Sequence, residues 1–275
     1  AAWCHKGVAL ARLGRLEEAL SALGMALGMD NGLEAAWFHL GIAQEGLARY
    51  EEAVESFGKA VRIQGRSSRA WFHLGQSFQS LGRDGEALGP LNEAIRLEPE
   101  NGGARFLEGL SLYRLDRFKK AAASLEKAVR LSPSHARAWY QLGYSFQMLG
   151  RLPEARDALD RAMELSYGGL HVLLRQGLIL EDLGDHSGAV LSFSRAVELD
   201  PNSGDGFFHL GLAQLALRKY EAAVESFGKA VKIQGKASRS WFHLGQAYLE
   251  LGQNEEALAP LKEAIRLEPD NAEAR

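Results

Sequence analysis

The sequence predicts an all-α fold, a solenoid of about eight helix-turn-helix repeats, and three observations carry that prediction. A glycine recurs every 34 residues from Gly7 to Gly245, one alanine from Ala19 to Ala257, and a second alanine from Ala26 to Ala264. All 24 positions match without insertion or deletion. A fixed period of this length indicates stacked supersecondary units. Such stacks form long concave surfaces that usually bind other molecules.

Residues 68–101 show how one repeat is built. Trp71, Leu74 and Phe78 follow the three-to-four spacing of an amphipathic helix, which Gly82-Arg83-Asp84 interrupts. The apolar positions over 87–97 predict a second helix, and Pro99 ends it because proline cannot continue a helix. Connections this short make neighbouring helices antiparallel.

Repeated in register, this pattern makes the chain a single array. The predicted repeats cover residues 1–33, 34–67, 68–101, 102–135, 136–169, 170–203, 204–237 and 238–271, and residues 272–275 begin a ninth. The chain has no starting Met and opens inside a repeat, so we expect it to be a fragment of a longer array.

The recurring glycine falls inside the first helix of each repeat, where it costs about 1 kcal/mol relative to alanine. Such a cost repeated eight times needs a reason. We expect a close approach of the paired helix, with the two recurring alanines supplying the complementary small surface.

Composition and charge exclude several classes of function. Hydrophobic residues make up 46% of the chain and charged residues 24%, with a net charge of −3. This balance gives no indication of a nucleic-acid partner. No apolar run is long enough for membrane insertion, and no secretory signal peptide is visible. We therefore expect a cytoplasmic protein.

The motifs of catalysis and cofactor binding are also missing from the sequence. It contains no phosphate-binding glycine loop, no cysteine-rich zinc spacing and no nucleophile elbow. The nearest acid–base grouping, His171 with Glu181 and Asp182, comes without a nucleophile. We expect no cofactor, no metal and no enzyme activity.

The repeat resembles the tetratricopeptide repeat, and the resemblance covers the whole chain. In residues 68–101 it rests on Trp71, Leu74-Gly75, Phe78, Ala87, Leu91, Ala94 and Pro99. Where the family prefers Trp, this chain has Arg105 and Leu173. In place of the closing Pro it has Gly65, Tyr167 and Gly235, which puts those local turns in doubt. The resemblance implies a right-handed superhelix whose first helices line the concave face.

A larger duplication is superimposed on the repeat. Residues 50–66 and 220–236 agree at 14 of 17 positions, and residues 71–76 return unchanged as residues 241–246. The offset of 170 residues corresponds to a block of five repeats. The block indicates a recent duplication, and it could also present one binding surface twice.

Family geometry implies that positions two, five, six, nine, twelve and thirteen of each repeat lie on or near the concave face. The fifth position is mostly aromatic: Phe38, Phe72, Phe106, Tyr140, Phe208 and Phe242. These rings are open to two interpretations, ordinary packing within the family or a row of apolar contacts for a ligand. Two arginines at the second position, Arg69 and Arg239, join the candidate site.

The sixth position is mostly histidine. It carries His39, His73, His209 and His243, with Gln141 and Arg175 in two other repeats. In arrays resembling the repeat domain of O-linked N-acetylglucosamine transferase, an asparagine ladder at this position grips the backbone of an extended peptide. Imidazole can also donate and accept a hydrogen bond, with added sensitivity to pH near neutrality. The alternative is a set of solvated histidines inherited through duplication.

Geometry argues against a metal ion shared by these histidines. Packed helices lie about 8 to 10 Å apart, whereas the nitrogens that bind one zinc ion each lie about 2 Å from the metal. An extended peptide advances about 3.3 Å per residue, so roughly every third residue would meet the sixth-position side chain of a repeat. We therefore favour an extended segment of a partner protein over a helical one.

Three functions follow from these patterns. The first is a non-catalytic scaffold that binds a peptide segment of a partner protein in the concave groove. The second is self-association through the end repeats into a structural assembly. The third is a substrate-recruiting arm of a larger enzyme such as a glycosyltransferase, which the family resemblance allows.

Overall fold

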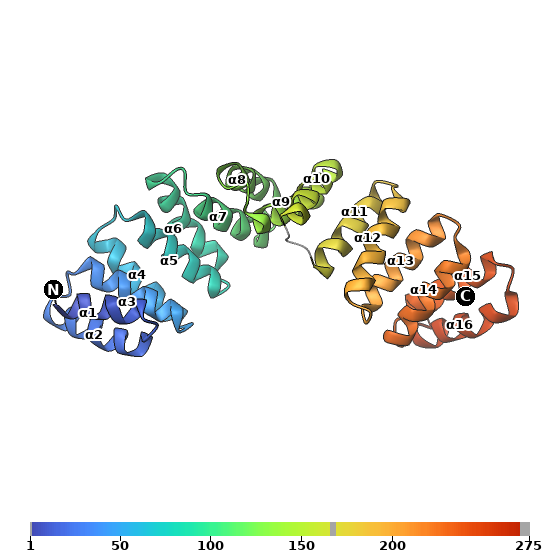
Figure 1. Ribbon diagram of the computed structural model, residues 1–275, viewed down its shortest axis with the longest axis horizontal. Coiled ribbons are helices and arrows are strands. Elements are labelled where there is room, and N and C mark those ends of the chain that lie inside the picture. The colour runs from blue at the N-terminus through green and yellow to red at the C-terminus, as the bar shows by residue number, and fades with distance from the viewer. Residues whose placement is uncertain (1, 166–168, 270–275) are drawn as a thin grey trace. The chain divides into compact units, whose positions relative to one another are not determined.

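The computed structural model describes residues 2–165 and 169–269. Within those ranges it contains sixteen α-helices joined by short turns, and no strand (Figure 1). The predicted all-α solenoid of helix pairs is confirmed. No helix among the described residues is long and apolar enough to cross a membrane.

The chain divides into two compact units, residues 1–149 and 150–275. The first contains α1 (Ala2–Arg12), α2 (Leu16–Met29), α3 (Glu34–Gly46), α4 (Tyr50–Ile63), α5 (Ser68–Ser80), α6 (Asp84–Leu97), α7 (Gly102–Arg114), α8 (Phe118–Leu131) and α9 (Ala136–Met148). The second contains α10 (Leu152–Glu164), α11 (Leu170–Asp182), α12 (His186–Leu199), α13 (Gly204–Ala216), α14 (Tyr220–Ile233), α15 (Ser238–Glu250) and α16 (Asn254–Leu267).

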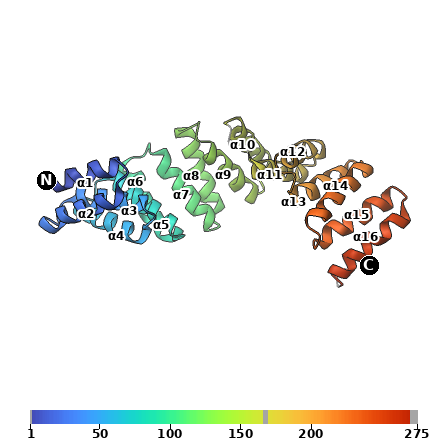
Figure 2. The same cartoon turned by 60° about the horizontal axis from the view of Figure 1, so that its bottom comes forward.

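Within each unit, consecutive helices pack as antiparallel neighbours, as Figures 1 and 2 show. The odd-numbered helices also contact one another in sequence: α1 with α3, α3 with α5, α5 with α7 and α7 with α9 in the first unit, and α11 with α13 and α13 with α15 in the second. Side chains on these first helices are therefore brought into one row within each unit.

The recurring glycine marks a tight contact inside the helix pair, as expected, but the atoms nearest to it belong to a large side chain and not to the side chains of the recurring alanines. A Cβ atom built on Gly41 would lie 2.7 Å from the ring of Phe57, and one on Gly75 would lie 2.6 Å from Leu91 Cγ. Phe57 and Leu91 are fully buried. The glycine therefore makes room for a large side chain, which projects from the second helix between the two recurring alanines.

The turn between successive repeats is secured by the recurring tryptophan. The indole nitrogens of Trp37, Trp71, Trp139 and Trp241 donate hydrogen bonds of 2.8 to 3.0 Å to the carbonyl six residues earlier. The acceptor is a backbone group, so Gly65 and Gly235 serve as well as Pro133. These two turns keep this hydrogen bond without the closing proline, whereas Tyr167 lies outside the described residues.

Candidate functional site

A pocket of about 310 Å³ opens where α1, α3 and α5 lie side by side. Its lining consists of Val8, Ala11, Arg12, Phe38, His39, Ile42 and Arg69. All seven residues occupy the second, fifth, sixth, ninth, twelfth or thirteenth position of a repeat. These are the positions expected on the inner surface.

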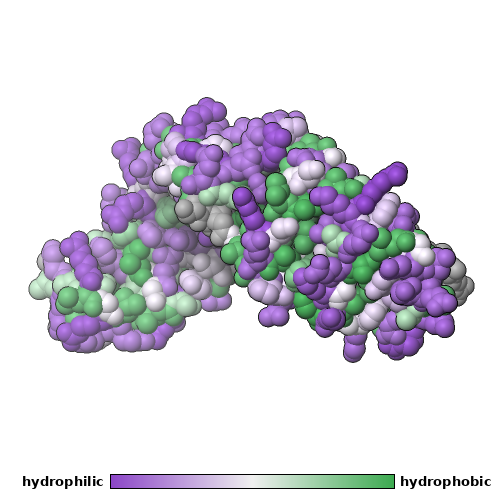
Figure 3. Space-filling view, turned by 45° about the vertical axis from the view of Figure 1, so that its right-hand side comes forward, coloured by the Kyte–Doolittle hydropathy of each residue, from purple (hydrophilic) through white to green (hydrophobic). Residues whose placement is uncertain are grey.

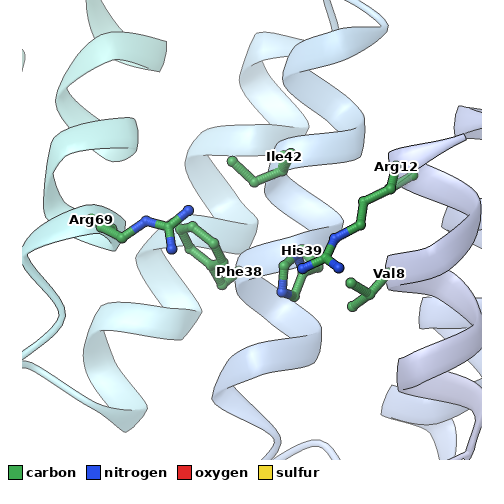
Figure 4. A pocket seen from close by; sticks show the side chains of 7 residues that line it. Val8, Arg12, Phe38, His39, Ile42 and Arg69 are labelled. Atoms are coloured by element: carbon green, nitrogen blue, oxygen red, sulfur yellow. The ribbon is translucent and has the colours of Figure 1, made fainter. Parts of the chain in front are cut away.

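The pocket combines an apolar floor with two guanidinium groups. Val8, Phe38 and Ile42 supply the floor, while Arg12 on α1 and Arg69 on α5 reach in from either side of α3 (Figure 4). The guanidinium carbon of Arg69 lies 5.4 Å from the centre of the Phe38 ring, within range of a cation–π contact. Among the described residues, neither arginine forms an ion pair with a carboxylate.

His39 lies between these two charges. Its ring is half-buried and meets the Phe38 ring edge-on, at 5.2 Å between centres. Burial lowers the pKa of His39 below its usual value, and the positive charges of Arg12 and Arg69 lower it further. The neutral imidazole that results offers one hydrogen-bond donor and one acceptor.

A second, smaller hollow continues the row within the first compact unit. It has a volume of about 190 Å³ and is lined by Gln76, Gln79, Ser80, Leu107, Leu110, Arg114 and Arg137. Gln79 Nε2 donates to the carbonyl of Leu107 at 2.7 Å and to Ser111 Oγ at 2.6 Å. The polar floor of this hollow is thus fixed by contacts between neighbouring repeats.

Three of the six predicted aromatic side chains lie in the core. Phe38, Phe106 and Phe208 expose only 8%, 6% and 8% of their surface, whereas Phe72, Tyr140 and Phe242 are half-buried. Each of the three buried rings is faced by an exposed arginine of the next repeat, at 5.3 to 5.6 Å: Arg69, Arg137 and Arg239. At these three positions a partner would therefore meet the stacked guanidinium group and not the aromatic ring.

Three of the predicted histidines stack on phenylalanines that the sequence analysis did not single out. His73, His209 and His243 lie parallel to Phe57, Phe193 and Phe227, with ring centres 5.5, 5.5 and 5.7 Å apart. Each of these phenylalanines lies in the second helix of the preceding repeat. The signal was in the sequence, because a phenylalanine occurs at that position in the repeat before each of these three histidines.

Polar neighbours also hold the histidines, which are therefore not free in solvent. His73 Nδ1 lies 2.9 Å from Glu45 Oε2, and that carboxylate also accepts a hydrogen bond from Ser77. His243 Nδ1 lies 3.0 Å from Gln246 Oε1.

The remaining predicted site residues are buried or half-buried, so they do not form an open row of exposed side chains. His209 Nδ1 lies 3.8 Å from Glu181, without a hydrogen-bond partner among the described residues. Gln141 is buried and Arg175 is half-buried. In the part of the chain that the structure describes, no group of three or more His, Cys, Asp or Glu could hold a metal ion.

Comparison with protein families gives one consistent result. A family model described as tetratricopeptide repeat matches residues 38–102, 106–169 and 208–272. A second model with the same description matches residues 1–32 and 170–203. No curated protein sequence matches the chain.

Solved structures of similar proteins share the fold. YrrB, described as a TPR protein with an unusual peptide-binding site, is 23% identical, with a TM-score of 0.62 over 67% of this chain and 95% of that one. The C-terminal part of a TPR repeat-containing protein from Cytophaga hutchinsonii is 18% identical, with a TM-score of 0.71 over 86% and 97%. Pseudomonas aeruginosa pilF is 20% identical, with a TM-score of 0.60 over 77% and 97%.

Proposed function

This chain belongs to the tetratricopeptide repeat family, and from that premise we propose that it is a protein-interaction scaffold. It holds an extended segment of a partner protein along the row of odd-numbered helices. The observation that carries the proposal is the pocket between α1, α3 and α5, whose lining comes from three successive repeats. No single repeat could form it, so the pocket is a product of the stack.

The spacing and chemistry of the row favour an extended segment. Packed helices lie about 8 to 10 Å apart, which equals about three residues of an extended chain. The exposed Arg69 and the half-buried His39 can donate hydrogen bonds to the backbone carbonyls of such a segment. The peptide-binding site named for YrrB, which shares this fold, gives the proposal further support.

The molecular surface of the chain mixes apolar and polar side chains. On the face seen in Figure 3, hydrophobic patches alternate with hydrophilic side chains. A limited apolar floor with polar surroundings is the usual make-up of a site that binds a single segment.

Selection from a display library of random extended peptides would test the proposal. We expect the chain to enrich peptides whose affinity falls about tenfold or more in an Arg12→Ala/Arg69→Ala variant, because the two guanidinium groups are desolvated on binding. The matched control is Arg62→Ala, an exposed arginine on α4. Peptides that bind the pocket variant and the wild type equally well would refute the groove proposal.

Self-association is a second candidate, and exposed apolar side chains favour it. Met25 and Met29 on α2 expose 50% and 71% of their surface, and Leu258 on α16 exposes 54%. Uncovered apolar surface of this kind can pair with a second copy. Sedimentation that stays monomeric over a wide range of concentration would rule this candidate out. The recruiting-arm function stays a prediction, since it needs a catalytic domain joined to this chain.

A further inference from the structure

The lining of the pocket has a counterpart in the second compact unit. The duplication offset of 170 residues takes α1, α3 and α5 to α11, α13 and α15. It takes the apolar floor of Val8, Phe38 and Ile42 to Leu178, Phe208 and Leu212. We call the residues that line the pocket the first surface, and we call their counterparts at the offset of 170 residues the second surface.

The two surfaces share two ring contacts, although His209 also stacks on Phe193 and lies 3.8 Å from Glu181. Arg69 lies 5.4 Å from Phe38, and Arg239 lies 5.3 Å from Phe208. The histidine that follows each phenylalanine meets its ring edge-on, at 5.2 Å for His39 and 5.3 Å for His209. Both phenylalanines expose 8% of their surface. Both surfaces therefore have the same phenylalanine and stacked arginine, with aliphatic residues at the other two floor positions.

The rims of the two surfaces differ in charge. Where the first surface has Ala11 and Arg12, the second has Glu181 and Asp182. With its histidine neutral, the first surface carries two positive charges and no negative one. The second carries Arg239 and two carboxylates, of which Glu181 lies 3.8 Å from His209 Nδ1 and Asp182 faces no ion-pair partner among the described residues. Arg12 and Asp182 are both exposed, and neither is in an ion pair among the described residues.

We propose that the two surfaces select peptide side chains of opposite charge. The first surface binds a segment in which an acidic side chain lies next to an aliphatic one, and the second binds a segment in which a basic side chain takes that place. The inference rests on the proposed function and names the partner chemistry of each surface. The aliphatic side chain packs on the shared floor, while the charged one meets Arg12 or Asp182 at the rim. An exposed rim charge of this kind discriminates between partners more than it raises overall affinity.

The test uses the full chain and three short labelled peptides. The peptides share one sequence of alternating leucine and serine and differ only at the centre, which is glutamate, glutamine or lysine. Titration calorimetry is expected to show one glutamate-peptide site and one lysine-peptide site per wild-type chain. Each should be preferred over the glutamine peptide by about tenfold, and the preference should weaken as salt is raised.

Exchange of the rims supplies matched variants. Ala11→Glu/Arg12→Asp copies the second rim onto the first surface, so the chain should bind two lysine peptides and lose the glutamate site. Glu181→Ala/Asp182→Arg makes the reverse change and should give two glutamate sites. Arg62→Asp on α4 lowers the net charge by two, against three for Ala11→Glu/Arg12→Asp, and touches neither rim, so it controls for most of the change in net charge. Arg12→Gln removes the rim charge without adding an acid, and it should weaken the preference for the glutamate peptide. Circular dichroism checks that each variant is folded.

Two failures are distinguishable. If the wild type binds none of the three peptides, the proposed groove function fails and this inference fails with it. If all three peptides bind with the same affinity and exchange of the rims changes nothing, the groove function stands and the charge selection is wrong. An effect of Arg62→Asp as large as that of the rim variants would also overturn the inference, because it would indicate general attraction between net charges.

Discussion

At the scale of single residues, His39 shows how the inner row sets the properties of a side chain. Burial and two arginines from neighbouring repeats, Arg12 and Arg69, all disfavour its charged form. These arginines come from α1 and α5, so the effect depends on three helices being stacked. An isolated repeat would leave the pKa of this histidine near its usual value of 6.5.

A pH dependence of stability follows from the lowered pKa. The folded state binds a proton on His39 less readily than the unfolded chain does. The resulting stabilisation is therefore present above about pH 6.5 and is lost as the pH falls through the lower folded pKa. Between pH 7.5 and pH 5 we expect the wild type to lose more free energy of unfolding than His39→Gln does. Urea unfolding of both proteins at each pH measures the difference, and equal losses would contradict the prediction.

Ala48 carries a backbone strain that a single substitution can remove. It lies in the turn between α3 and α4 with φ of 58°, where glycine occupies the same position in five other repeats. Left-handed backbone costs an alanine roughly 1 to 2 kcal/mol, which exceeds the entropy that glycine adds to the unfolded chain. We expect Ala48→Gly to stabilise the protein by about 0.5 to 1 kcal/mol in chemical unfolding. Ala123→Gly, inside α8, should destabilise it by about 1 kcal/mol. The same sign for both substitutions would contradict this explanation.

At the scale of helices, the recurring glycine and its large partner define how closely each pair packs. Gly41 and Gly58 provide a matched comparison, because a Cβ on Gly41 would meet Phe57 at 2.7 Å whereas one on Gly58 would meet nothing within 4 Å. We expect Gly41→Ala to destabilise the protein by about 1 to 3 kcal/mol through overpacking. Gly58→Ala should stabilise it by about 0.5 to 1 kcal/mol, since alanine is the better helix former. Thermal unfolding of both variants measures this, and a neutral Gly41→Ala would mean that the pair can separate without cost.

The helices could be predicted from the sequence because the residue patterns that begin and end them are local. The break predicted at Gly82-Arg83-Asp84 agrees with α5 ending at Ser80 and α6 beginning at Asp84. The glycine contact was also predictable in kind, since eight unfavourable residues at one position needed a packing reason. The identity of the contacting side chain was not predictable, because it depends on the rotation of the second helix about its own axis.

For the candidate site, the sequence predicted which repeat positions lie on the inner row but not which side chains contact one another there. The sequence placed Phe38 and Arg69 on the inner row, but the stacking of one on the other depends on how far one repeat is offset from the next. The same offset sets the contact of His73 with Phe57 and Glu45. Arg12 was not assigned to the site from the sequence, because the residues that it meets in the pocket belong to the following repeats.

At the scale of the whole molecule, contacts are confined to near neighbours in the helix order. Among the described residues, helices pack with the next helix or the next but one. Stability in such an array is a sum of repeat terms and interface terms, with no single core on which all the repeats depend.

Residues 1–135, which contain α1 to α8 and the first surface, should therefore fold alone. We expect a helical fragment with a lower unfolding midpoint than the full chain, because fewer interfaces support it. It should bind the glutamate peptide with unchanged affinity. Circular dichroism and calorimetry measure these properties. A fragment without helical structure would show that folding needs residues beyond the four repeats.

The pairing of a conserved floor with an exchanged rim has a consequence for how such proteins diversify. At both surfaces Phe and Arg stack on one another, while the two residues at the edge are Ala-Arg in the first and Glu-Asp in the second. Arg12 and Asp182 are exposed, so substitutions at these two positions disturb little packing. Under the proposed charge selection, copying a block of repeats and substituting two edge residues is enough to give a second binding surface with the opposite charge preference.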